Sequence, residues 1–402
     1  MEHGTRGYFL QELNKQANEA QAKDLREAEL TSLKSKFFPT PGKMSKIQYE
    51  SAPAAPEMSR WGVDTPLRPQ PKLPGNCCVC CSCCGAPPSP IDTKNILRDG
   101  GKYVQLSDGR IVEYFVYGSE ATDARVLVQI NGSMGTGWMF GQFPASVQKL
   151  KELNVKGLSI TVPGHGYSSA QAGRKIGDWA KDDVEPVLMA EGVTGLFMVE
   201  GTSFGSSHAM AVAAHFGERV SALHLHVPYL PLEMRREMGW DEYGQEDALK
   251  CEPAWASSCC SCSFCIFCLC GTMACCHKNS PSAFADEHTK KLDAEVPGTL
   301  KIINEDVDRS AAMGVYGWVH NALVPTTSAN WGFNPREIKT QKVIISYAED
   351  DVQSPGQHGK WLSEFFTQNA ATSKVNVGSG MGHAQHQVKM VNGDFISQIA
   401  MI

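Results

Sequence analysis

A serine flanked by glycines is the residue of this sequence best suited to chemistry. Ser203 lies between Gly201 and Gly205 in the pattern Gly-x-Ser-x-Gly, directly after an apolar run and directly before the helix-forming run SSHAMAVAAHFG. In a strand–turn–helix elbow of this kind, the serine adopts a strained backbone conformation and the glycines leave room for neighbouring chain. The hydroxyl then projects at a helix N-terminus, whose amides favour developing negative charge. A glycine-flanked helix cap is the alternative interpretation of the pattern alone.

Two residues late in the chain can supply the base and the acid that such a serine needs. A serine hydroxyl is a weak nucleophile at neutral pH, so it requires a hydrogen-bonded base that a carboxylate orients. His383 follows the glycine-rich loop GSGMG, which can bring an imidazole over the end of a strand, and Asp351 follows the apolar run KVIISY. We therefore expect Ser203, His383 and Asp351 to converge as nucleophile, base and orienting acid.

Nearby residues compete for the last two roles. Glu349 and Asp350 precede Asp351, which is preferred because a proline follows it four residues later; the alternative is a solvated acidic loop. His386 lies one helical turn beyond His383, so its side chain is expected to face elsewhere.

Backbone donors for an oxyanion hole are also present. The N–H group of Phe204, the residue after the candidate nucleophile, can supply one donor. The second is expected from the loop NGSMG that follows the run VLVQI, with Ser133 or Met134 as the donor. Each such donor contributes about 3 kcal/mol to transition-state stabilisation. The alternative for this loop is a flexible connection between a strand and a helix.

Short apolar runs separated by helix-length segments must position these residues. Runs that are apolar on both faces indicate a parallel sheet covered by helices on both sides. A β-hairpin precedes them at residues 102–118, where Asp108 and Gly109 suit a type I′ turn. The alternation of strand-length and helix-length segments is absent from residues 229–333. We interpret these residues as an insertion over the carboxyl edge of the sheet, where open α/β sheets bind ligands. The expected strands lie at residues 126–130, 155–162, 195–200, 220–227, 342–347 and 373–377.

Residues 102–402 resemble the α/β-hydrolase superfamily, in particular its esterases and lipases. The resemblance rests on the chain order of elbow serine, aspartate and histidine, and on two further segments, PGHGYSS at residues 163–169 and WGF at residues 331–333 followed by Ile338. It implies an α/β-hydrolase fold with a mostly parallel sheet and helices on both faces. The implied core covers residues 99–228 and 334–402, with a cysteine-rich cap at residues 229–333.

The resemblance also implies a function. Ser203, Asp351 and His383 would cleave a carboxylic ester through an acyl-enzyme. The apolar stretch of the insertion, and not the resemblance, favours a lipid-like acyl group. A catalytically silent scaffold that binds a ligand or partner, and an acyltransferase with the same triad, are the alternatives. Two positions depart from the family: Asn131 stands where the oxyanion loop usually begins with histidine, and Val162 stands where an aspartate usually precedes the Pro-Gly segment.

Residues 1–98 differ from this core in composition. Residues 6–38 are rich in helix formers and predict one long helix, and residues 39–90 contain enough proline to predict an unpacked linker. The linker contains a first cysteine cluster at residues 77–84, and a second lies at residues 259–276. The uncharged stretch 253–276 favours an apolar contact, so S-acylation and peripheral membrane contact are one hypothesis. There are two alternative hypotheses. One is a metal site, suggested by the C-x2-C spacing of Cys262, Cys265 and Cys268. The other is that the cysteines are inert or disulfide-linked.

The overall composition limits the partners. The chain is 42% hydrophobic and 20% charged, which is ordinary for a globular protein, and its net charge of −6 provides no basic surface for nucleic acid. The first residues lack the basic and apolar regions of a secretory signal, so an intracellular setting is expected. We expect a small-molecule ester substrate, no cofactor and no catalytic metal.

Overall fold

The structure is a computed structural model that describes residues 90–171, 174–230, 287–313, 331–351, 354–369, 372–383, 386 and 395–400. The expected N-terminal helix, most of the proline-rich linker and both cysteine clusters lie outside the described residues. Most of the insertion at residues 229–333 does so as well, apart from two helices near its end.

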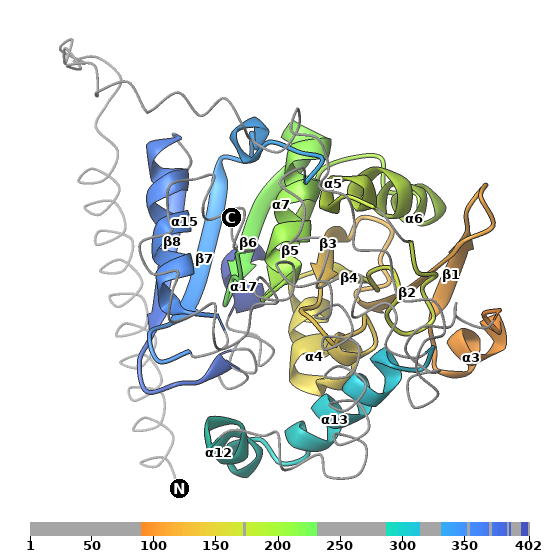
Figure 1. Ribbon diagram of the computed structural model, residues 1–402, viewed down its shortest axis with the longest axis horizontal. Helices are drawn as coiled ribbons and strands as arrows, with labels where there is room; N and C mark the ends of the chain where they lie inside the picture. The colour runs from red at the N-terminus through yellow and green to blue at the C-terminus, as the bar shows by residue number, and fades with distance from the viewer. Residues whose placement is uncertain are drawn as a thin grey trace, which may run out of the picture. The chain divides into compact units, whose positions relative to one another are not determined.

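An eight-stranded sheet forms the centre of the described part of the chain, with the strand order β1-β2-β4-β3-β5-β6-β7-β8 (Figure 1). The first two strands run antiparallel to their neighbours, and the strands from β4 to β8 are all parallel. The sequence prediction of a mostly parallel sheet is therefore confirmed. The strands are β1 Lys102–Gln105, β2 Ile111–Gly118, β3 Arg125–Ile130, β4 Val155–Ile160, β5 Phe197–Thr202, β6 Val220–His226, β7 Lys342–Ala348 and β8 Thr372–Gly378.

The predicted hairpin is present, but its turn type differs from the prediction. The N–H of Gly109 donates to the carbonyl of Leu106, and the N–H of Leu106 donates to the carbonyl of Arg110. Only Gly109 has a positive φ, of 86°, whereas a type I′ turn requires a positive φ at Asp108 too. The loop is therefore the longer type of hairpin connection, in which a β-turn is followed by a glycine in the left-handed conformation, after which strand pairing resumes.

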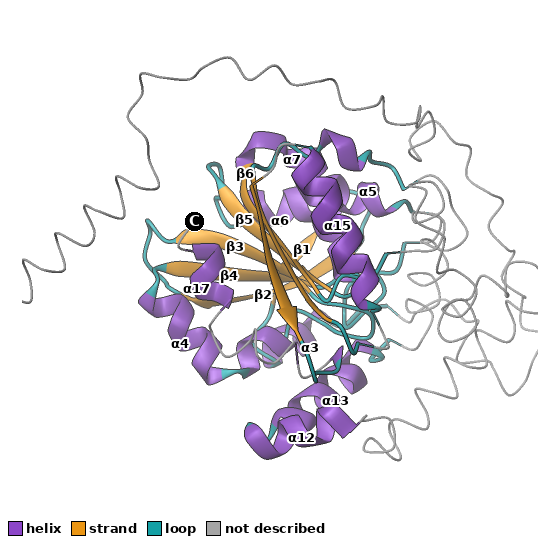
Figure 2. Ribbon diagram, turned by 90° about the vertical axis from the view of Figure 1, so that its left-hand side faces the viewer, coloured by secondary structure: helices purple, strands orange, loops and turns teal. Residues whose placement is uncertain are grey.

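Helices cover both faces of the sheet, as Figure 2 shows. On one face lie α5 (Ile176–Trp179), α6 (Glu185–Ala190), α7 (Gly205–Phe216) and α15 (Gly356–Gln368), with the π-helical turn η3 (Ala180–Val184) between α5 and α6. On the other face lie α4 (Pro144–Glu152) and α17 (Phe395–Ala400). The short 3-10 turns are η2 (Met139–Gln142), η4 (Gly217–Arg219) and η7 (Pro335–Glu337).

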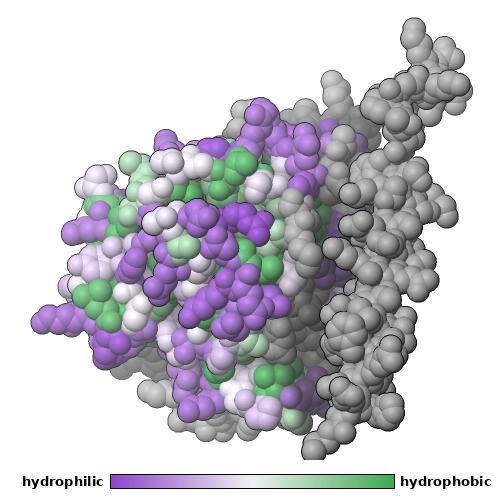
Figure 3. Space-filling view, turned by 180° about the vertical axis from the view of Figure 1, so that it is seen from behind, coloured by the Kyte–Doolittle hydropathy of each residue, from purple (hydrophilic) through white to green (hydrophobic). Residues whose placement is uncertain are grey.

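Alternating side chains of the strands build the two cores. Val126, Val128 and Ile130 of β3 pack into the larger core under α7, while Leu127 points to the smaller core under α4 and α17. Burial of this apolar surface is the main driving force for the fold. On the described surface in Figure 3, polar side chains predominate and hydrophobic ones are scattered among them.

A row of buried polar side chains crosses the smaller core. Gln129 donates to Glu200 at 3.0 Å, and His224 Nε2 lies 2.9 Å from the hydroxyl of Ser346. Burial raises the pKa of Glu200 to about 7 and lowers the pKa of His224 to about 3. Because His224 stays neutral at physiological pH, no buried cation offsets a charge on Glu200 within the row. The members of the row are Tyr117, Gln129, Glu200, His224, Ser346, Asn376 and Gln398.

A short helix before the predicted core boundary at residue 99 packs against the sheet. Helix α3 (Thr93–Arg98) begins after Asp92, whose side chain accepts a hydrogen bond from the N–H of Lys94. The same helix buries Ile96 completely. An added Cβ at Gly101 would lie 2.9 Å from side-chain atoms of both Ile96 and Phe115, so this helix packs against β2.

Two described helices of the insertion, α12 (Glu287–Glu295) and α13 (Thr299–Ser310), pack against each other and against the core. Leu292 of α12 is buried with Met139 and Phe143, which come after the loop that follows β3. Arg309 of α13 forms ion pairs with Asp99 and with the fully buried Glu113 of β2. The end of the insertion is thus attached to the core beside the loop that follows β3.

Candidate active site

The turn between β5 and α7 has the strained backbone predicted from the sequence. Ser203 has a φ of 54°, a left-handed conformation that is uncommon for residues other than glycine. Its N–H donates to the carbonyl of His226 at 2.8 Å, and its carbonyl accepts from the N–H groups of Ser206 and Tyr229. Both backbone polar groups of the serine are therefore paired, and its side chain is left at the carboxyl edge of the sheet.

The glycines around this turn are required by close backbone contacts. An added Cβ at Gly205 would lie 2.5 Å from the carbonyl oxygen of Asn131 and 2.7 Å from that of Ile130. An added Cβ at Gly201 would lie 2.5 Å from the Cβ of Ala209. Real Cβ atoms do not approach other heavy atoms so closely, so helix α7 can start only where it does if these positions lack side chains.

An imidazole and a carboxylate meet at the same edge. His383 Nδ1 lies 2.6 Å from Asp351 Oδ2, and both side chains are buried. The other oxygen of Asp351 accepts the N–H of Ser354 at 2.9 Å. Because Nδ1 faces the carboxylate, Nε2 is the imidazole nitrogen available to act as a base.

The competing residues have different surroundings. Asp350 accepts the N–H of Gly380 at 2.5 Å, in the middle of the glycine-rich loop, and the side chain of Glu349 is exposed. His386 lies one turn beyond His383, and its Nδ1 is 2.8 Å from Nε2 of His226. The two rings stack with centroids 4.9 Å apart, and desolvation holds the pKa of His226 well below its usual value. His386 thus packs on His226, the residue whose carbonyl accepts the N–H of Ser203.

The three residues follow parallel strands at one edge of the sheet, with β6 between β5 and β7. Ser203 follows β5, Asp351 comes three residues after the end of β7, and His383 comes five residues after the end of β8. Within the described residues, no hydrogen bond joins the hydroxyl of Ser203 to His383. Such catalytic hydrogen bonds are often long in enzymes without substrate and tighten in the complex.

The predicted oxyanion donors face no competing acceptor. Among the described residues, none accepts a hydrogen bond from the N–H groups of Phe204, Ser133 or Met134. The N–H of Gly132, in contrast, donates to Oδ1 of Asn131 at 2.9 Å. An added Cβ at Gly132 would lie 2.8 Å from the Cβ of Ser203, so the loop after β3 directly adjoins the serine.

Sequence reasoning missed Asp306, a buried acid of α13 that contacts this loop. Asp306 accepts hydrogen bonds from both the N–H and the hydroxyl of Thr136, at 2.9 and 2.5 Å, and from the side-chain amide of Asn131 at 3.2 Å. Burial raises the pKa of Asp306 to about 7. No local pattern marks this residue, because its partners lie about 170 positions earlier in the chain.

The Pro-Gly segment at residues 163–169 is held by an acid that the sequence analysis also missed. Glu113 accepts hydrogen bonds from the hydroxyl of Thr161 and the N–H of Tyr167, at 3.0 and 3.4 Å. The residue directly before this segment is the buried, apolar Val162, and the carboxylate that binds the segment belongs to β2. Gly166 donates to the carbonyl of Ser310, which joins the segment to the end of α13.

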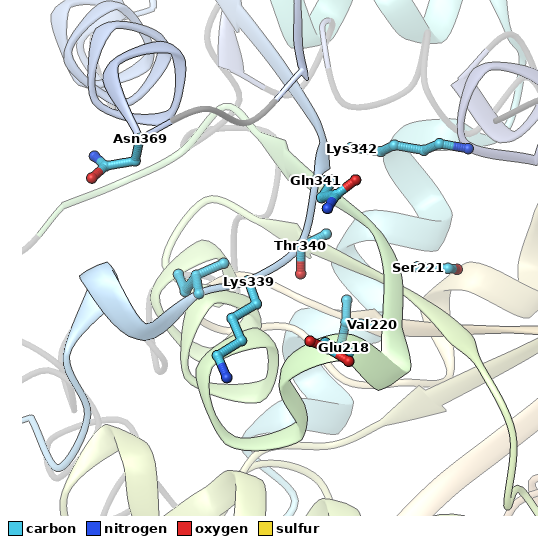
Figure 4. Close-up of a pocket in the computed structure, with 9 residues that line it drawn as sticks. Glu218, Val220, Ser221, Lys339, Thr340, Gln341, Lys342 and Asn369 are labelled. Carbon is cyan, nitrogen blue, oxygen red and sulfur yellow. The ribbon is translucent and has the colours of Figure 1, made fainter.

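A pocket of about 660 Å³ lies at the opposite edge of the sheet (Figure 4). It is next to Val220, where β6 begins, and Lys342, where β7 begins, whereas the candidate site lies where the strands end. The pocket therefore does not belong to the candidate site. Its lining residues are Glu218, Val220, Ser221, Ile338, Lys339, Thr340, Gln341, Lys342 and Asn369.

The described residues contain neither a metal-binding cluster nor a membrane-spanning helix. No group of three metal-binding side chains occurs among them, and none of their helices is long and apolar enough to cross a membrane. The cysteines of both clusters lie outside these residues.

Comparison with known proteins shows likeness in structure alone. The sequence matches no protein-family model and no curated protein. Three solved structures cover 75% of this chain: an enol-lactonase from Burkholderia xenovorans LB400 (14% identity, TM-score 0.53, 100% of that chain), a thermophilic esterase from Thermogutta terrifontis (15%, 0.51, 98%) and a bromoperoxidase from Bacillus anthracis (14%, 0.50, 99%). At these identities the matches establish the fold and leave the activity open.

The close contacts at the elbow predict the effect of a small substitution. Gly205→Ala should destabilise the protein by about 1–3 kcal/mol, because the new methyl group meets two carbonyl oxygens of the backbone. Helix propensity alone predicts that the substitution stabilises the protein, since alanine is more favourable than glycine in a helix by about 1 kcal/mol. Urea unfolding measures the difference. Gly195→Ala is the matched control, because no atom lies within 4 Å of its added Cβ; equal stability of the two variants would contradict the steric account.

Proposed function

We propose that this chain, which has the α/β-hydrolase fold, is a serine hydrolase that cleaves a carboxylic ester through an acyl-enzyme. The observation that carries the proposal is the 2.6 Å contact between His383 Nδ1 and Asp351 Oδ2 at the edge where Ser203 has its left-handed backbone. A buried, oriented imidazole beside a strained serine is the arrangement that activates a hydroxyl for nucleophilic attack.

In the proposed mechanism, the hydroxyl of Ser203 attacks the ester carbonyl while Nε2 of His383 accepts its proton. The negative charge of the tetrahedral intermediate is stabilised by the N–H of Phe204 and by that of Ser133 or Met134. The imidazolium, held by Asp351, then protonates the departing alcohol. Water repeats the sequence on the acyl-enzyme and regenerates the serine.

The substrate is proposed to have a lipid-like acyl group. This preference comes from the uncharged residues 253–276 of the insertion, which lie outside the described part of the chain. An acyltransferase would use the same residues, with an alcohol in place of water in the second step. A silent scaffold is the remaining alternative, and the missing hydrogen bond between Ser203 and His383 is the observation in its favour.

Covalent labelling tests the proposal directly. A fluorophosphonate probe should label the wild-type protein, because its reaction requires an activated serine, and Ser203→Ala should abolish the label. Ser107→Ala, at an exposed position of the hairpin turn, is the control and should label normally. Folded wild-type protein that takes up no label would favour the silent scaffold. Hydrolysis of p-nitrophenyl esters of increasing length then reports the acyl preference.

The choice of orienting acid can be tested with two isosteric variants. Asp351→Asn should lower kcat for ester hydrolysis by roughly 10⁴-fold, since an amide stabilises the wrong imidazole tautomer. Asp350→Asn should retain kcat within about tenfold, because Asp350 contacts the N–H of Gly380 and lies outside the triad. A larger loss in Asp350→Asn than in Asp351→Asn would reverse the assignment.

We further propose that cysteines at residues 77–84 or 259–276 are S-acylated and give the protein peripheral membrane contact, since two lipid anchors hold where one is marginal. Cells fed a clickable palmitate should yield labelled protein, and hydroxylamine should remove the label because it cleaves thioesters. Replacing the six cysteines of residues 77–84 by serine tests the first cluster separately. Absence of a hydroxylamine-sensitive label would remove the hypothesis, and stoichiometric zinc in the purified protein would support the metal alternative.

A further inference from the structure

We propose that Asp306, on helix α13 of the insertion, is a positioning residue that sets the backbone of residues 131–136 and so aims the second oxyanion donor at the substrate. The inference rests on the proposed function, because it concerns the same reaction. Its consequence is that the insertion does more than cover the site: part of the catalytic apparatus is assembled only when α13 is docked.

The contacts of Asp306 connect the two ends of this loop. Asn131 begins the loop and Thr136 ends it, and both donate to the same carboxylate oxygen, at 3.2 and 2.9 Å. The hydroxyl of Thr136 donates to the second oxygen at 2.5 Å. The two candidate donors, Ser133 and Met134, lie between these two anchored residues.

The rest of the loop shows why its ends must be held. Met134 has a φ of 61°, a strained conformation that persists only where surrounding contacts determine it. The side chain of Asn131 also donates to the carbonyl of Thr136 at 3.0 Å while accepting the N–H of Gly132. Asparagine, in the place of the family's histidine, therefore provides a donor for Asp306 and an acceptor for the loop from one short side chain.

Helix α13 is itself fixed firmly enough to position a carboxylate. Arg309, one turn beyond Asp306, forms ion pairs with Asp99 and Glu113. The carbonyl of Ser310 accepts the N–H of Gly166 at 3.1 Å. Asp306 is 1% exposed, so water competes little for its hydrogen bonds.

Ionisation of Asp306 matters because its carboxyl group accepts three hydrogen bonds, from Asn131 and Thr136. As a carboxylate it can accept all three hydrogen bonds, whereas a protonated carboxyl presents a donor of its own. Arg309 of α13 and Glu113 of β2 are the charged groups that face it: Arg309 favours the carboxylate and Glu113 opposes it, while burial dominates and raises the pKa of Asp306 to about 7. The oxyanion loop should therefore tighten as pH rises through about 7.

The first test is Asp306→Asn, assayed by ester hydrolysis. The amide replaces one of the two acceptor oxygens with a donor and removes the negative charge, so kcat should fall roughly 10- to 100-fold while KM changes less than about threefold, as expected when a donor is misplaced only for the transition state. Glu305→Gln is the matched control: it removes an acid from the adjacent, exposed position of the same helix and should leave kcat unchanged. The step in the pH dependence of kcat that belongs to Asp306 should also be absent from Asp306→Asn.

A second pair of variants keeps the inference testable if Asp306→Asn does not fold. Thr136→Val removes the hydroxyl that donates to Asp306 and should lower kcat, whereas Thr136→Ser retains it and should recover most of the loss. In the double variant Asp306→Asn/Thr136→Val, the loss should be close to that of the more damaging single variant, because both changes break one contact. Additive losses, or equal kcat in Thr136→Val and Thr136→Ser, would overturn the inference.

The outcomes also separate this inference from the proposed function. If the wild-type protein neither hydrolyses esters nor takes the serine probe, the proposed function fails and the role of Asp306 fails with it. If the wild-type protein is active and Asp306→Asn matches Glu305→Gln in kcat, KM and pH dependence, only the positioning role is wrong.

Discussion

The left-handed backbone of Ser203 is the constraint on which the site depends. A φ of 54° is costly for a residue with a side chain, and it persists because neighbouring elements determine it. Strand β6 fixes the N–H of the serine through His226, and Ser206 and Tyr229 fix its carbonyl. The loop after β3 closes the remaining side, where Gly205 touches its backbone. The parallel sheet thus supplies both the strain and the contacts that maintain it.

Two carboxyl groups are buried in the core of the protein, where water does not reach them. Glu200 lies on β5 and Asp306 on α13, and in each case desolvation raises the pKa to about 7. Their partners differ, because Glu200 meets Gln129 and a neutral histidine, whereas Asp306 accepts three donors. Low-dielectric surroundings strengthen satisfied hydrogen bonds and penalise unsatisfied ones, so the surroundings of Asp306 favour an ordered loop.

The sequence predicted what depends on local pattern. Apolar runs gave the strands from β3 to β8 within about two residues, and the Gly-x-Ser-x-Gly pattern located the turn with the positive φ at Ser203. The hairpin turn was assigned the wrong type, because Asp108-Gly109 fits two loop geometries. Asp306 and Glu113 were missed for a physical reason: their roles arise from packing between distant segments, and a single acid in a helix or strand has no periodic signature. The role of Ile96 in anchoring α3 escaped for the same reason.

The docking of α13 against the loop after β3 has a consequence for how this fold can be modified. Where an insertion only covers a cleft, one insertion can be exchanged for another, which alters substrate selectivity and leaves the catalytic residues unchanged. Here the carboxylate that spans Asn131 and Thr136 belongs to the insertion. On the proposed mechanism, a chimera with a foreign cap would need its own acid at that point, and a compound that binds between α13 and the core would slow turnover without occupying the substrate site.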